Sequence, residues 1–252
     1  GAGAGAAVTD VLDMTGGTSN VGLGSGSLGT AITTGTENTA IGADSLDAVT
    51  TGAYNVAVGK DALTDQTTGN YNVAVGRRAG YDITTGSENV AIGYLSLYAA
   101  TTASNNIAIG TSALQANTSG TDNVAVGDRA GTAITTGSNN TAIGDVALTA
   151  NTTGAGNTAI GADSLDANTT GDSNVAIGKS ALTANTTANT NVAIGAAAME
   201  ANTTGANNVA VGAVALDANT TASNNTALGY AALGANTTGT PNTAVGYQAA
   251  TA

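Results

Sequence analysis

The sequence predicts an all-β protein, a parallel β-solenoid (a β-roll or β-helix) with one 17-residue repeat per coil and about 14 coils. Three observations predict this fold. A five-residue motif, first seen as Asn38-Thr39-Ala40-Ile41-Gly42, returns every 17 residues from residue 38 to residue 242 without an insertion or deletion. Apolar and small residues alternate within the motif, which is typical of a strand. Glycine follows, and Thr-Thr-Gly closes most repeats as a turn. Repeats of fixed length are characteristic of solenoids and related arrays.

The repeats predict two regions in the chain. Residues 1–19 are rich in Gly and Ala, and we expect either a lead-in or a strand that caps the first coil. Residues 20–252 form the solenoid, beginning with a diverged copy at Asn20, 18 residues before Asn38. The last residues stop inside a coil, so we expect a segment of a longer fibre or a rod that stacks end to end.

The first half of the repeat predicts a strand and a corner. Counted from the asparagine, position 1 is Asn, position 3 is Ala and position 5 is Gly in all thirteen regular copies. Positions 2 and 4 are β-branched or Leu, so we expect them to face the core, with Ala on the opposite face. Two interpretations of the unvarying Ala remain open: a surface that another chain approaches closely, or a tight contact within the coil. Glycine at position 5 allows a sharp corner.

The second half of the repeat predicts another short strand, over positions 8 to 12. Position 9 is usually Leu, but two regular coils have Gly there and Ile at position 12, and the diverged first coil shows the same swap. These pairs are Gly80 with Ile83, Gly131 with Ile134, and Gly29 with Ile32. A lost Leu matched by a gained Ile indicates volume compensation in a shared interior. We therefore expect one narrow core from positions 4, 9 and 12. Seventeen residues also accommodate a short helix, but recurrent Gly, Asn and Thr disfavour it.

Composition and charge argue against several functions. The net charge of −12, from 17 acids and five bases, opposes binding to nucleic acid or an anionic membrane. No apolar run is long enough to insert into a membrane. The chain has neither His nor Cys, and we assign no catalytic, cofactor-binding or metal-binding residue and no cofactor. Acids in variable columns (Asp44, Asp61, Asp163 and Asp166) are expected to be solvated corner charges.

Position 12 matches the N-glycosylation sequon in seven repeats. The candidate asparagines are Asn117, Asn151, Asn168, Asn185, Asn202, Asn219 and Asn236. We favour a side-chain ladder at this turn over glycans, because a repeat makes the sequon recur. The Thr pairs also suggest ice binding, although adjacent residues of a strand face opposite ways. Tyrosines align at position 17 (Tyr54, Tyr71) and position 6 (Tyr94, Tyr230, Tyr247), where they cover corners or stack on sugars.

Two stretches of the repeat resemble known families. Residues Asn225 to Gly239 are similar to repeats in tail-fibre-like proteins of bacteriophages and in bacterial surface proteins. The motif at Asn89 to Gly93 and Asn174 to Gly178 resembles the head repeat of trimeric autotransporter adhesins. That resemblance implies a left-handed parallel β-roll, three chains around an axis, and binding to host matrix or other surfaces. The adhesin repeat is shorter, so a corner of each coil is larger here.

These expectations combine into one functional hypothesis. The chain is a structural or adhesive, non-enzymatic component of an extracellular, cell-surface or virion-borne fibre. Its expected partners are other copies of itself, as a homotrimer or a head-to-tail filament, and a host-surface glycan or matrix. The alternative is an ice- or carbohydrate-binding solenoid that uses an exposed Thr/Asn ladder.

Overall fold

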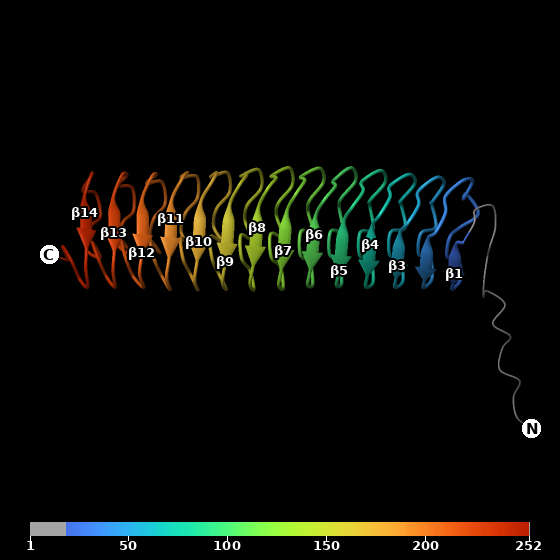
Figure 1. The fold of residues 1–252 in the computed structure, drawn as a ribbon, viewed down its shortest axis with the longest axis horizontal. Coiled ribbons are helices and arrows are strands. Elements are labelled where there is room, and N and C mark those ends of the chain that lie inside the picture. The colour runs from blue at the N-terminus through green and yellow to red at the C-terminus, as the bar shows by residue number, and fades with distance from the viewer. Residues whose placement is uncertain (1–18, 252) are drawn as a thin grey trace, which may run out of the picture.

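The computed structural model describes residues 19–251, which form a single straight stack of coils (Figure 1). The predicted lead-in or cap of residues 1–19 lies outside the described residues except for Ser19. Each coil contributes one three-residue strand to a parallel 14-stranded sheet whose strands follow in chain order. The strands are β1 Val21–Leu23, β2 Thr39–Ile41, β3 Val56–Val58, β4 Val73–Val75, β5 Val90–Ile92, β6 Ile107–Ile109, β7 Val124–Val126, β8 Thr141–Ile143, β9 Thr158–Ile160, β10 Val175–Ile177, β11 Val192–Ile194, β12 Val209–Val211, β13 Thr226–Leu228 and β14 Thr243–Val245.

Neighbouring strands pair in register, so every column of the repeat becomes a straight row along the rod. In the middle of the stack, for example, Val124 pairs with Thr141 and Val126 with Ile143. At about 4.8 Å between strands, the stack is roughly 60 Å long. The predicted 17-residue parallel β-solenoid is therefore confirmed.

The two faces of the strand are the reverse of our prediction. The alanine of position 3 is buried in every coil, whereas the side chains of positions 2 and 4 are half exposed; Ala40 is 0% exposed and Ile41 is 39% exposed. The reason is the thinness of the coil. A Cβ placed on Gly22, which occupies position 3 of the first coil, would lie 3.0 Å from Cδ1 of Leu28. Only a methyl group fits between the strand and the position-9 leucine, so the tight contact within the coil explains the alanine.

Positions 6 to 11 form turns, and the predicted second strand is wrong. Positions 7 and 9 have positive φ in the regular coils, as at Val146 (φ 51°) and Leu148 (φ 53°). A β-turn encloses position 7, with Ala147 N donating to Gly144 O at 3.4 Å, and a second β-turn starts at position 9, with Asn151 N donating to Leu148 O at 3.4 Å. Positive φ is unfavourable for leucine. Complete burial of the Leu148 side chain offsets that cost and places it in the core.

The core therefore consists of positions 3, 8, 9 and 12. Volume compensation between positions 9 and 12 is confirmed in two coils. Ile83 and Ile134 are fully buried, and a Cβ on Gly131 would lie 3.0 Å from Ile134 Cδ1 and 3.1 Å from Leu114 Cδ2. The first coil differs, because its position 9 is Leu28, which is buried and donates its backbone N–H to Ser45 O. Gly29 therefore does not replace the position-9 leucine of the first coil, and the predicted compensation by Ile32 does not hold there.

A double-mutant cycle tests this compensation. Ile134 lies between Asn117 and Asn151 in the position-12 row. Ile134→Asn leaves a cavity and should cost about 2–4 kcal/mol. Gly131→Leu overfills the same space and should cost about 1–3 kcal/mol. Together they recreate a majority coil, so we expect the double variant to be close to wild type in urea unfolding. Additive losses would show that the two positions do not share one volume.

Candidate functional surfaces

An asparagine ladder at position 1 runs through the interior of the rod. Asn140 donates its backbone N–H to Asn123 Oδ1 at 3.0 Å and its side-chain Nδ2 to the same oxygen at 3.1 Å. Nδ2 also donates to Gly154 O at 2.9 Å, which joins the start of the coil to its end. The side chains are buried throughout the stack. We did not predict this ladder from the sequence, although position 1 is Asn in all thirteen regular copies and that invariance indicates a shared structural role.

The predicted ladder at position 12 is also present. Asn168 donates Nδ2 to Asn151 Oδ1 at 2.9 Å in the preceding coil and to Gly171 O at 3.0 Å in its own coil. Six of the seven sequon residues are 0% exposed: Asn117, Asn151, Asn168, Asn185, Asn202 and Asn219. Asn236, near the end of the stack, is partly exposed. Glycosylation stays a prediction, and in a folded coil a glycan would displace the hydrogen bonds of Nδ2.

The outer face of the sheet is apolar along its whole length. Positions 2 and 4 are Val, Ile, Leu or Thr in all fourteen strands, with no charged residue. Exposed large apolar side chains occur only in these two columns and in the flanking columns 17 and 6, among the residues described. Tyr54 and Tyr71 form a stacked pair on one flank, with ring centroids 4.9 Å apart. Tyr230 and Tyr247 stack on the other flank. Positions 2 and 4 of the fourteen strands are called the outer apolar face below, and columns 17 and 6 flank it.

The two columns of the Thr-Thr corner differ in exposure. Position 13 hydroxyls donate to the backbone of the next coil, as Thr135 Oγ1 does to Thr152 O at 3.0 Å. Position 14 is exposed in every coil, for instance at Thr136. Because both asparagine ladders are buried, an exposed ladder at this corner would consist of the position-14 residues, joined by position 13 where that is exposed, as at Thr101 and Thr118.

The four acids singled out in the sequence lie at the corner opposite the Thr-Thr turn, at positions 7 and 10. Asp61 is only 8% exposed and pairs with Lys60 at 3.1 Å and Arg78 at 3.4 Å, so it is not a solvated charge. Asp44 is more exposed and lies 3.5 Å from Lys60. Burial and the charge of Asp163 raise the pKa of Asp166. Within residues 19–251, no three such groups are placed to hold a metal ion.

A basic and aromatic group, overlooked in the sequence, occupies the same corner between residues 60 and 98. Tyr81 and Tyr98, both at position 10, stack with ring centroids 5.3 Å apart. The guanidinium of Arg78 lies over the Tyr81 ring, and that of Arg77 lies over the Tyr94 ring, each 5.7 Å from the centroid. The signal was available, because two tyrosines 17 residues apart must stack in a solenoid.

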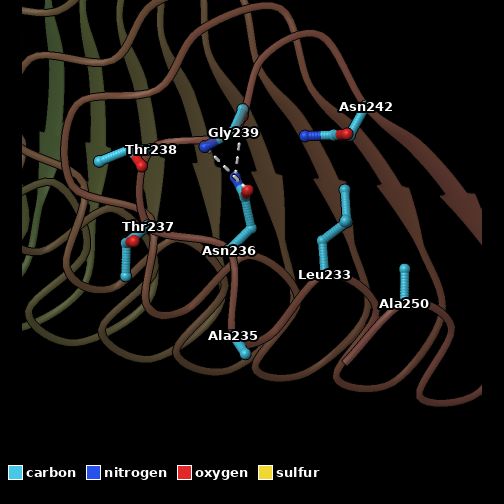
Figure 2. Close-up of a pocket in the computed structure, with 8 residues that line it drawn as sticks. All are labelled: Leu233, Ala235, Asn236, Thr237, Thr238, Gly239, Asn242 and Ala250. Atoms are coloured by element: carbon cyan, nitrogen blue, oxygen red, sulfur yellow. Dashed lines mark hydrogen bonds between the residues drawn. The ribbon is translucent and has the colours of Figure 1, made fainter. Parts of the chain in front are cut away.

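An open pocket of about 320 Å³ lies at the C-terminal end of the stack (Figure 2). Its lining residues are Leu233, Ala235, Asn236, Thr237, Thr238, Gly239, Asn242 and Ala250. Asn236 and Gly239 bond to each other there through Asn236 Oδ1, which accepts from Gly239 N at 3.1 Å. In earlier coils the next Asn-Thr-Thr-Gly segment covers this position, so the pocket is the open end of the last described turn.

The chain offers no further feature that identifies it. The structure describes no helix in residues 19–251, hence none long and apolar enough to cross a membrane. Comparison with protein-family models, curated proteins and solved structures gave no match for this 17-residue β-solenoid with its asparagine ladders.

Proposed function

We propose that the chain is a structural and adhesive, non-enzymatic segment of an extracellular or virion-borne fibre, in which copies associate side by side through the outer apolar face. The observation that carries the proposal is the absence of any charge from two columns in fourteen strands. Long exposed apolar surfaces of this kind mark interaction sites. None of the acidic residues that the structure describes lies in these two columns, so the charge that favours solubility is placed outside them.

Another copy of the same chain is the best-matched occupant. Ridges of Val, Ile and Leu recur at the spacing of the strands, about 4.8 Å. A partner with a different spacing would lose register within a few coils, whereas an identical rod stays in register along the full length. The resemblance to trimeric adhesin heads and tail fibres supports three copies around this face. The position-3 alanines make no contact with a second copy, because that column lies inside the coil.

The test is a charge placed in the middle of the face. We expect wild-type protein to elute with a mass that is a multiple of 23.8 kDa in size-exclusion chromatography with light scattering. Val126→Glu with Ile143→Glu should weaken association at least roughly tenfold and yield monomer, because unpaired charges would be buried. The coil should remain folded by circular dichroism, since both side chains point outward.

A matched control adds the same two charges away from the face. Gln115→Glu with Thr149→Glu changes position 10, where Glu200 already occurs. This variant should keep the wild-type mass. Wild-type protein that stays monomeric at every concentration would refute the proposed self-association, and equal dissociation of both variants would refute the role of the outer apolar face.

A further inference from the structure

Three adjacent coils differ from the rest in chemistry but not in fold. Residues 54–98 hold five of the seven tyrosines and three of the five basic residues. In other coils the same columns most often contain Ala, Ser, Thr, Asp or Asn, with the same backbone turns. At position 6, for example, Ala162 and Ala196 stand where these coils have Arg77 and Tyr94. The solenoid therefore does not require these side chains, and their clustering calls for another explanation.

The side chains form two groups at the corner over positions 6 to 10, one of which is the Arg77–Tyr94 pair. Lys60 and Arg78 both pair with Asp61, and Arg78 also lies over Tyr81. Tyr81 then stacks on Tyr98 with an angle of 14° between the rings. These contacts fix the aromatic rings and the guanidinium groups before any ligand arrives, which lowers the entropic cost of binding.

The two groups left for a ligand are an aromatic surface and a cation. Tyr94 is 44% exposed, and Arg77 is exposed and makes no ion pair with any residue that the structure describes. The Tyr94 ring supports the Arg77 guanidinium, which leaves its edge N–H groups to donate to a carboxylate in a bidentate pair. A half-exposed tyrosine has an apolar ring face and a polar hydroxyl. A sugar ring matches it, because such a ring is apolar on one face and carries hydroxyls at its edge.

We infer that this corner, formed by Arg77, Tyr94 and the Tyr81–Tyr98 pair, binds an acidic oligosaccharide. A sugar ring stacks on tyrosine, and its carboxylate pairs with Arg77. The inference rests on the proposed adhesive function, for which it names the ligand class. The corner begins at position 6, after the strand has ended at position 4, so it lies beside the outer apolar face that a second copy covers and not within it.

The test measures binding of the full chain to immobilised hyaluronate and polygalacturonate, with neutral dextran as the uncharged control. We expect binding to at least one acidic polymer and none to dextran. With a net charge of −12 the rod as a whole repels polyanions, so binding must come from a local site. Arg77→Ala, Tyr94→Ala and Tyr98→Thr should each weaken it roughly tenfold, because each removes a direct contact. All three residues introduced are found at the same positions in other coils.

Matched variants outside the corner complete the experiment. Lys179→Ala and Tyr230→Ala change the same position-6 column and should bind like wild type. Failure of wild-type protein to bind either acidic polymer would overturn the inference, as would equal losses in the corner and control variants. Light scattering on the same samples separates the two proposals: a wild-type oligomer without glycan binding would overturn this inference and leave self-association intact.

Discussion

Replacing Gly144 with alanine is expected to lower the free energy of unfolding by at least about 3 kcal/mol, the largest single effect in the rod. Gly144 occupies position 5, where the chain leaves the strand with a φ of 138°. L-residues rarely adopt this conformation. A Cβ there would also lie 2.6 Å from the backbone carbon of Gly161 in the next coil, and backbone atoms cannot move aside cheaply. Hydrogen exchange of the amides around residues 127–161 would report the loss coil by coil.

The same chain supplies a control for this prediction. Position 15 is also glycine in most coils, but Ala103, Ala188 and Ala222 occupy it in three. None of these residues has a positive φ, and all three are buried. A Cβ on Gly154 would likewise clash with Gly171 O, so the two sites are similarly crowded but differ in φ, and Gly154→Ala should cost less than Gly144→Ala. Equal costs would show that packing volume, and not backbone conformation, makes position 5 invariant.

The period and the strand could be read from the sequence, but the orientation of the strand could not. Strict alternation shows that positions 2 and 4 share a face and that position 3 is on the other. It does not say which face is inside when one side is Ala and the other Val or Ile. The usual preference, large apolar residues inside, holds for cores thick enough to contain them. In this coil Leu46 already fills the space opposite Ala40, so Ile41 lies outside.

The second apolar segment was misassigned for a related reason. Leucine and alanine at positions 8 to 12 indicate burial, and sequence reasoning then supplies a strand. The structure buries the same residues by reversing the sign of φ at positions 7 and 9, which no residue preference predicts for leucine. Comparing the same columns between copies of the repeat was more informative than residue preference. The pairing of Gly131 with Ile134 correctly placed positions 9 and 12 in one core.

The candidate surfaces were predictable only in part. The ladder at position 12 was predicted from recurrence of Asn in one column. The tyrosine columns were recognised too, but the stacking of their rings on each other was not predicted. The basic corner depends on contacts across columns, such as Arg78 with Tyr81, and the repeat alone does not reveal which columns meet.

Asn140→Ala should cost about 2–4 kcal/mol of unfolding free energy. The change removes Nδ2, which donates to Gly154 O, and Oδ1, which accepts from both Asn157 N and Asn157 Nδ2. Alanine leaves the Gly154 carbonyl and the Asn157 N–H buried without these partners, and each such group carries a desolvation penalty. Because coils contact only their neighbours, we expect faster hydrogen exchange in the coils that begin at Asn123, Asn140 and Asn157, with distant coils unchanged.

A variant of the adjacent Asn139 tests whether the loss of stability comes from the ladder or from removal of any asparagine. Asn139 precedes Asn140 but is exposed at position 17, where Ser173 occurs in another coil. Asn139→Ser should change the free energy of unfolding by no more than about 0.5 kcal/mol. If the two variants unfold alike, the ladder adds nothing beyond the backbone bonds between coils. A loss confined to Asn140→Ala means that each buried amide holds its own coil closed and attaches it to the next. The invariance of the motif's first residue would then follow from stability alone, without any ligand.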